Sequence, residues 1–483
     1  MSTIPRRRDI DNAAARPIYF IRLHPPVTCL PLIAALALII PGCVTVNPHE
    51  SFAVIDRTIG DRTRQQIHWR SGSEEDDAVD QAIREMLAQP LTADAAAQIA
   101  LLNNRRLQAI YEDLGVAQAD LVQAGLLSNP TFSPSLLFPT AGGDLRPNLG
   151  LTQTFLDIFF IPLRKRVAES RLAAAQQRIA DRVIAHAANT RAAFYRVQAD
   201  MQAVSLLRDI TASTRESLDT VRQFREAGSV TYLDVRNKEA LLERVQMELT
   251  RADSQLDISR EQVTVLMGLS GDDADHARWT AEPGLPQLPQ DEIPMKELEE
   301  RSLENSLTLA AIRADVDAAG GELGMTEASA LLPAATAGAS AQRRSGEWFV
   351  GPSLSIPIPI FDQGQAVKAA AEHRLRQQHH SYEAAIAEVR SASRTAARRV
   401  RIAREVANHY RDVLLPLREE IYEDSLLQFN AMNISILDLI AVRQQQMDTE
   451  REYIEALFDY WLARTQLDQI LAGSTPGMTG AGQ

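Results

Sequence analysis

Residues 227–235 read AGSVTYLDV, and residues 431–439 read AMNISILDL. Three further pairs of segments match in the same order and at nearly the same offset: Leu107-Gln108-Ala109-Ile110 with Leu309-Ala310-Ala311-Ile312, Leu126-Leu127 with Leu331-Leu332, and 149–157 with 354–362. This offset of roughly 200 residues is far longer than the 20–50 residues of a solenoid repeat. The sequence therefore predicts one duplicated supersecondary unit.

Each unit predicts a helix, two short alternating segments and a very long helical hairpin. The first helices are expected at about 95–128 and 296–332. No proline lies between Pro162 and Pro283, and no glycine between Gly150 and Gly228, which favours uninterrupted helix. A helix over 163–226 would extend roughly 95 Å. The second hairpin is expected at 364–428 and 437–472, with a kink at Pro416.

The returning helix of the first hairpin carries apolar residues at alternating spacings of three and four. This spacing predicts a heptad seam, in which Ser259 occupies the one polar position. The outgoing helix shows the same rhythm over residues 194–204. Long helices with such seams pack as coiled coils against neighbours, so the expected fold class is mainly α. The seam positions are Leu242, Val245, Leu249, Ala252, Leu256, Val263 and Leu266.

The short segments alternate apolar and polar residues with a period of two. They are predicted as strands at 131–138, 149–155, 334–341 and 354–360, with polar turns at 139–147 and 342–347. Their length suits a strand that crosses a bilayer, and a soluble hairpin packed on the helices is the alternative. Four strands cannot close a barrel, and lipid does not tolerate open edges. Membrane-spanning strands would therefore require several copies of the chain, in a number that the residues do not fix.

Composition excludes other classes. The chain has 483 residues, of which 45% are hydrophobic, 5% aromatic and 23% charged, with a formal net charge of −13. A mean hydropathy of −0.18 argues against a polytopic helical membrane protein, and the acidic balance against a duplex nucleic-acid binder. Two cysteines, Cys29 and Cys43, are too few for a disulfide scaffold.

The N-terminus has the layout of a secretory signal. Arginines precede the apolar run 27–40, which is too short to span a bilayer and ends Ile40-Pro41-Gly42-Cys43. This ending resembles a bacterial lipobox and predicts acylation (palmitate included) at Cys43, while an ordinary signal peptide and a retained anchor remain alternatives. In the lipobox analogy, Val44 after the cysteine favours the outer membrane. The predicted organisation is a signal peptide (1–42), a lipid-anchored strap (43–95), two repeats (96–285 and 286–472) and a flexible tail (473–483).

The whole arrangement resembles the TolC-type outer membrane efflux proteins, in particular lipid-anchored members that serve resistance-nodulation-division pumps. The resemblance covers about 95–472. It is carried by the motifs already described and by Asn104-Arg105-Arg106-Leu107, Leu126-Leu127-Ser128-Asn129-Pro130 and Ile360-Phe361-Asp362-Gln363-Gly364-Gln365. It implies a homotrimer whose four strands per chain form a 12-stranded β-barrel on a periplasmic α-helical barrel.

The same resemblance implies a function. Such a protein would be the outer membrane channel of a tripartite efflux system and would passively export drugs or heavy-metal cations. Its partners would be a periplasmic adaptor, an inner-membrane transporter and outer membrane lipid, with no nucleic acid. The alternative is a lipid-anchored periplasmic coiled-coil protein without a pore, structural or adaptor-like. No catalytic constellation is visible, so no enzyme, metal site or cofactor is expected.

The hairpin turns 227–234 and 431–438 are expected to form a periplasmic tip and gate. Asp234 and Asp438 begin the returning helices, where a carboxylate is favoured by the helix dipole. The alternative is that copies of these residues form acidic rings that select cations. Met432 replaces Gly228 in the second turn, and Ala441 stands where the family often has a second acidic residue. The candidate tip residues are Gly228, Ser229, Asp234, Asn433, Ser435, Asp438 and Arg443.

Overall fold

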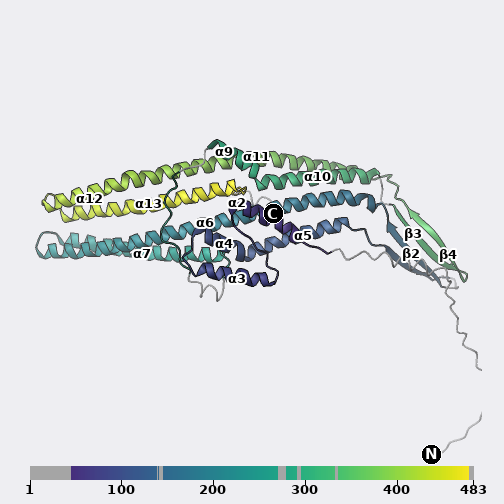
Figure 1. Cartoon of the computed structure of the whole chain (residues 1–483), viewed down its shortest axis with the longest axis horizontal. Helices are drawn as coiled ribbons and strands as arrows, with labels where there is room; N and C mark the ends of the chain where they lie inside the picture. Colours follow the sequence, from purple (N-terminus) through teal and green to yellow (C-terminus); the bar gives the residue numbers. More distant parts are fainter. Residues whose placement is uncertain are drawn as a thin grey trace, which may run out of the picture. The chain divides into compact units, whose positions relative to one another are not determined.

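The chain divides into two compact units, Met1–Thr45 and Val46–Gln483. The computed structural model describes residues 45–138, 140, 145–269, 279–290, 295–331 and 335–477. The signal peptide and Cys43 therefore lie outside the described residues. The second unit is mainly helical, with one small sheet at one end (Figure 1).

The first long hairpin consists of α6 (Asp157–Glu226) and α7 (Tyr232–Leu266). The 70 residues of α6 extend about 105 Å. The predicted start after Pro162 is wrong, because the helix begins at Asp157 and includes the proline in its second turn. A proline this near a helix start removes one hydrogen bond without interrupting the turns that follow. The seam is formed by buried residues of both helices: Phe194, Val197, Val204, Leu242, Val245 and Val263.

The second hairpin consists of α11 (Gln365–His409), the π-helical turn Tyr410–Leu414, α12 (Leu415–Asn430) and α13 (Ile436–Leu471). The irregularity predicted at Pro416 takes the form of this π turn, which ends just before the proline. Proline has no N–H to donate to the carbonyl four residues earlier, and the wider turn accommodates the missing bond.

Each predicted first helix is in fact two helices. Those of the first repeat are α4 (Ala93–Asn103) and α5 (Arg105–Gly125), and those of the second are α9 (Met295–Asn305) and α10 (Leu307–Leu331). The single-helix prediction is wrong because a side chain caps the second helix of each pair. The Asn104 Oδ1 atom accepts from Arg106 N at 2.8 Å, and the Ser306 Oγ atom accepts from Leu309 N at 3.2 Å. Such caps compete with helix continuation.

The segment before the first repeat forms α2 (His49–Thr63) and α3 (Glu74–Leu87). Ile55 and Ile59 of α2 are buried in a cluster with Tyr111 of α5 and Val183 of α6. At the other end of the chain, Ser474 and Thr475 are also buried. Residues 473–475, predicted as the start of a flexible tail, are therefore packed against the rest of the second unit, and the Gly473 carbonyl accepts from Leu307 N at 2.9 Å.

Four antiparallel strands form one sheet in the order β1 (Thr131–Leu137), β2 (Arg146–Thr154), β3 (Thr336–Arg344) and β4 (Glu347–Ser355). The fourth strand predicted at 354–360 is wrong in position, and most of the predicted turn 342–347 is strand. Pro357 and Pro359 cannot donate to a ladder, which keeps 356–360 outside it. The β3–β4 turn is Ser345-Gly346, both at positive φ (51° and 91°), as a two-residue hairpin turn requires.

The register places most of the apolar residues of the four strands on one face. Phe132 pairs with Leu151, Leu151 with Ala339, and Ala339 with Pro352. The opposite face holds mainly small and polar residues, in rows such as Thr131, Thr152, Gly338 and Ser353, together with Leu137 and Phe349. No helix in the described ranges is long and apolar enough to cross a bilayer.

Candidate functional site

The two hairpin turns adopt the same backbone conformation despite their different sequences. Gly228 has φ 77° and Met432 has φ 59°, so both lie in the left-handed region. Ser229 N donates to Phe224 O at 2.8 Å, and Asn433 N donates to Gln428 O at 2.9 Å. This is the bonding of a Schellman helix end, which glycine normally closes. The second turn departs from the glycine pattern in sequence only.

Asp234 and Asp438 close matching capping boxes. One Asp234 carboxylate oxygen accepts from Thr231 N at 2.8 Å and from Thr231 Oγ1 at 2.6 Å. The Asp438 carboxylate accepts from Ser435 N at 3.0 Å and Ser435 Oγ at 2.6 Å. These bonds lower the pKa of both aspartates, so each carboxylate stays ionised at neutral pH. The structure thus shows the helix-start role that the sequence suggested, while the acidic-ring role stays a prediction.

Arg443 does not contact either aspartate. Its Nη1 atom donates to Gln446 Oε1 at 2.6 Å, and its guanidinium lies 5.1 Å from the Tyr422 ring centroid on α12. Gln446 in turn donates to Glu419 of α12. Arg443 therefore contacts the neighbouring helix through the Tyr422 ring, and its amide partner Gln446 lies on its own helix. Gln446 could be expected as a partner of Arg443 because it lies three residues later on the same helix. The contacts of this pair with Tyr422 and Glu419 follow only from the packing of α12 on α13.

Near the tip, a small apolar cluster joins the two hairpins. Val221 of α6 and Val235 of α7 pack with Ile440 of α13. Lys238 lies beside Val235 on α7 and is only 9% exposed, with no acidic partner among the residues that the structure describes. Burial lowers the pKa of this lysine. Sequence reasoning missed Lys238, because its seam position looks like an ordinary surface charge.

Farther from the tip, a polar group ties the hairpins together. Ser259 of α7, the polar seam residue, donates to the buried Asp200 carboxylate of α6 at 2.6 Å. Arg196 pairs with Asp200 at 2.6 Å and with Glu455 of α13 at 3.1 Å. The serine in the heptad seam thus has a specific partner, and Arg196 links the two repeats.

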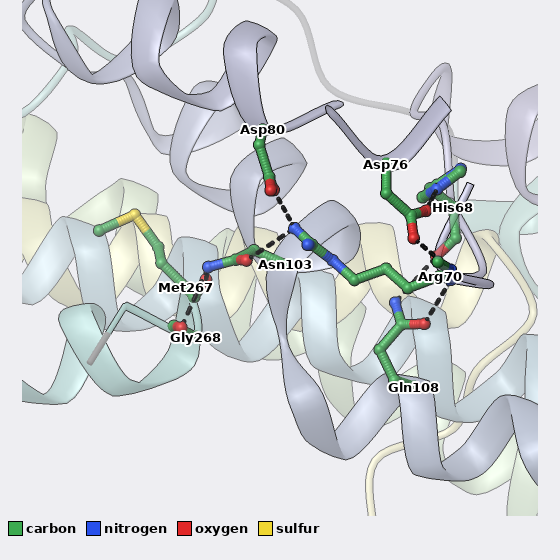
Figure 2. Close-up of polar contacts among 9 residues, drawn as sticks. His68, Arg70, Asp76, Asp80, Asn103, Gln108, Met267 and Gly268 are labelled. Carbon is green, nitrogen blue, oxygen red and sulfur yellow. Dashed lines mark hydrogen bonds and ion pairs between the residues drawn. The ribbon is translucent and has the colours of Figure 1, made fainter. Parts of the chain in front are cut away.

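Each returning helix ends against an asparagine of its own repeat, and we call these contacts the first and second joint. At the first joint, Asn103 Nδ2 donates to the carbonyls of Met267 (3.2 Å) and Gly268 (3.0 Å), as Figure 2 shows. At the second joint, Asn305 Nδ2 donates to the Leu471 carbonyl at 3.1 Å. These bonds satisfy carbonyls that a helix end leaves unpaired. Within the described residues, no group of three or more His, Cys, Asp or Glu side chains is arranged to hold a metal ion.

The second unit thus combines two long helical hairpins with a four-stranded sheet that has one mainly apolar face. This is the fold of outer membrane channel proteins of efflux systems. The sequence profile of the family described as "Outer membrane efflux protein" matches residues 96–269 and 298–473. The chain belongs to the outer membrane efflux protein family, whose profile matches it in these two separate segments.

Individual relatives agree with this assignment. The chain is 24% identical over 397 residues to the cobalt-zinc-cadmium resistance protein CzcC of Cupriavidus metallidurans, covering 80% of this chain and 90% of CzcC. Its fold is similar to a membrane protein from Pseudomonas aeruginosa, with a TM-score of 0.66 and 19% identity over 81% of this chain and 94% of that one. It is also similar to the open state of the MtrE outer membrane channel of Neisseria gonorrhoeae, with a TM-score of 0.64 and 18% identity over 79% and 89% of the two chains. The alternative of a poreless coiled-coil protein is not favoured.

Proposed function

We propose that this chain assembles as a homotrimer, lipid-anchored through Cys43, that forms the outer membrane channel of a tripartite efflux system. Substrates would pass through its lumen from an inner-membrane transporter and a periplasmic adaptor to the outside. The acidic tip residues Asp234 and Asp438 would line the periplasmic entrance. The proposal assigns the chain no catalytic step and no cofactor.

The observation that carries the proposal is the order in which the elements lie side by side. Near the tip, α6 packs between α7 and α13, and α13 packs against α12 (Figure 1). Near the sheet, α6 packs between α5 and α10, and α10 packs against α11. The sheet follows the same order from β1 to β4. The described part of the chain is therefore four elements wide along its length, with α5, α7 and β1 on one edge and α11, α12 and β4 on the other.

Two open edges of this kind favour closure by further copies. A head-to-tail contact between unlike edges makes a ring when the rotation closes. The unpaired backbone groups of β1 and β4 would pair between copies, which removes the edges that lipid does not tolerate. The helices at both edges (α7 on one, α11 and α12 on the other) keep large apolar side chains exposed, among them Met247, Ile258, Val265, Ile402, Val406 and Leu417.

The exposed apolar face of the sheet supports the proposal that the strands lie in the membrane. On its apolar face, Val350 is 75% and Leu354 69% exposed in the single chain, and Phe132 and Trp348 are also exposed. Such a face is stable only when lipid or protein covers it. With this face outward, the small polar side chains of the other face would line the lumen, as in barrels of this kind.

The test uses the full-length protein purified from membranes in detergent and inserted into planar bilayers. We expect three copies per particle by native mass spectrometry and stable single-channel conductance. A monomer that remains in solution without detergent and conducts nothing would overturn the proposal. Radiolabelled palmitate should be incorporated into the wild type and not into the Cys43→Ser variant, and incorporation by the variant would contradict the lipid anchor alone.

The proposed substrates are divalent heavy-metal cations. The support is the CzcC relative, which is named for cobalt, zinc and cadmium resistance, together with the ionised tip aspartates. Deleting the gene should lower tolerance to Co²⁺, Zn²⁺ or Cd²⁺ several-fold and leave tolerance to organic drugs unchanged. The reverse pattern would overturn the cation assignment without touching the channel proposal.

A further inference from the structure

The chain between α2 and α3 is held along its length by amide side chains of the first repeat. Gln98 of α4 accepts from Gln66 N at 3.1 Å and donates to Gln66 O at 2.9 Å. Gln108 of α5 accepts from Arg70 N and donates to the His68 carbonyl, both at 2.9 Å. Each glutamine thus satisfies a donor and an acceptor of an irregular segment, as a neighbouring strand would. The path of residues 64–70 is therefore fixed.

At one end of this segment, Arg70 reaches the first joint. Its Nη2 atom donates to Asn103 Oδ1 at 3.1 Å and pairs with Asp80 of α3 (Figure 2). The same Asn103 donates through its Nδ2 atom to the carbonyls of Met267 and Gly268, the two residues that follow α7, while Asn104 donates to the last carbonyl of the helix itself, that of Leu266. The guanidinium therefore fixes the orientation of the amide that caps α7. The Arg70 side chain is only 13% exposed, so little solvent competes for these bonds.

At the other end of the segment, Arg62 reaches the second joint. Its Nη1 atom donates to the Asn305 carbonyl at 2.6 Å and to the Ala472 carbonyl at 2.9 Å. These are carbonyls at the ends of α9 and α13. A Cβ atom on Gly473 would lie 2.2 Å from this same Nη1 atom, so the approach requires glycine.

The two arginines thus contact equivalent places in the two repeats from a segment that belongs to neither repeat. Both joints lie at the ends of helices that return from the tip, and both present helix-end carbonyls with partial negative charge. A cation at such an end is favourable, and Arg62 donates directly to these carbonyls through its Nη1 atom, whereas Arg70 acts on the first joint through the Asn103 side chain.

We propose that residues 49–87 act as a two-point clamp, in which Arg62 holds the second joint and Arg70 holds the first. The clamp fixes the base of each returning helix while the distant tip is free to move. The consequence for gating rests on the proposed channel function, but the clamp itself does not. Each arginine therefore stabilises its own joint more than the other.

Hydrogen–deuterium exchange on the detergent-purified full-length protein tests this crossed pattern. Arg62→Ala should speed exchange about tenfold at Leu307, whose amide bonds to Gly473 O, and in the last turn of α13, with little change at the first joint. Arg70→Ala should speed exchange by a similar factor at Arg106 and Leu107 and in the last turn of α7, with little change at the second joint. Equal effects of both variants on both joints, or no effect on either joint, would overturn the clamp.

Arg84→Ala is the matched control, because Arg84 lies on the exposed side of α3 in the same segment and should change neither joint. If Arg70→Ala fails to fold, Arg70→Lys replaces it, since lysine keeps the positive charge but its side chain ends one atom short of Nη2, the atom that bonds both Asp80 and Asn103. Faster exchange at the first joint alone would support the clamp, and wild-type exchange would contradict it.

A second arm asks whether the clamp restrains the tip. In planar bilayers, the double variant Arg62→Ala/Arg70→Ala should raise the open probability at least several-fold over Arg84→Ala. An unchanged open probability beside altered exchange would overturn the gating consequence and leave the clamp standing. The absence of any conductance in wild-type protein would count against the channel proposal instead.

Discussion

Single residues carry conformations that their types disfavour, and Met432 is the clearest case. It is 93% exposed and lies in the left-handed region, where a side chain costs roughly 1 kcal/mol relative to glycine. Its counterpart Gly228 adopts the same conformation without that cost. The second tip turn is therefore held in place by its hydrogen bonds and by the packing of Ile436 and Leu437.

Replacing Met432 with glycine should stabilise this turn by about 0.5–1 kcal/mol. Hydrogen exchange at the Asn433 amide should become slower by a factor of about two to five. Gly228→Ala should have the opposite effect and make hydrogen exchange at the Ser229 amide faster. Ala431→Gly is the control, because Ala431 has ordinary negative φ and gains nothing from glycine. Faster exchange in Met432→Gly would contradict the strain argument.

Asp181 is a second residue with an unusual setting. It is 7% exposed in α6, its Oδ1 atom has no hydrogen-bond partner, and burial raises its pKa from 3.8 to about 6, although a hydrogen bond with Ser474 and nearby Arg182 oppose the shift. The folded protein binds this proton more tightly than the unfolded chain. The resulting stability is therefore fully present below pH 4 and is lost as the pH rises through about 6.

Asp181→Asn should consequently raise the free energy of unfolding at pH 7.5 by about 1–2 kcal/mol and have little effect near pH 4.5. Thermal melting of the detergent-purified protein at both pH values measures the difference. Asp113→Asn is the control, because that carboxylate is exposed in its pair with Arg182. A stabilisation of equal size at both pH values would show that the ionised carboxylate is not the cause.

At the scale of elements, the short caps decide where the long helices begin. Thr231 and Asp234 close the start of α7, and Ser435 and Asp438 close the start of α13. Each box satisfies amides that a helix start leaves unpaired, with a carboxylate at the positive end of the dipole. The returning helices of the two hairpins therefore begin in the same way, and the turns that precede them also match.

Thr231→Val should weaken the first turn of α7 by about 1 kcal/mol. The expected readout is exchange at the Asp234 amide, which bonds to Thr231 Oγ1 at 3.2 Å and should become roughly fivefold faster. Thr250→Val is the matched control within α7, because the Thr250 hydroxyl only donates to the Gln246 carbonyl one turn earlier. Similar acceleration in both variants would mean that the loss is general and not a capping effect.

At the scale of the whole molecule, the two repeats form one row of helices that continues into one sheet. In the proposed assembly, lipid would cover the apolar face of the sheet, and neighbouring copies of the chain would cover the two unlike edges. The clamp at the joints and the Arg196 link lie within this row, away from both the sheet and the tip. The proposed function thus depends on surfaces that a single copy leaves uncovered.

Leu354→Arg should impair membrane assembly, because arginine on a lipid-facing strand costs about 2–4 kcal/mol near the bilayer midplane, once per copy. The measurement is the yield of assembled oligomer in outer membrane fractions. Ser353→Arg is the matched control, since Ser353 is next to Leu354 in β4 but lies on the opposite, mainly polar face of the sheet. Normal yield of Leu354→Arg would contradict the outward apolar face.

The sequence by itself determined the duplication, the long hairpins, the four strands and the family. Period, breaker residues and alternation are local signals, and each repeat presents them twice. It also located the tip turns and both capping aspartates, because a cap is formed by residues three positions apart.

Only the tertiary structure decided which distant residues meet. The aromatic partner of Arg443, the burial of Lys238 and Asp181, and the two arginines at the joints all depend on contacts between different elements of the chain. Burial and long-range hydrogen bonds follow from packing, and no local spacing encodes them.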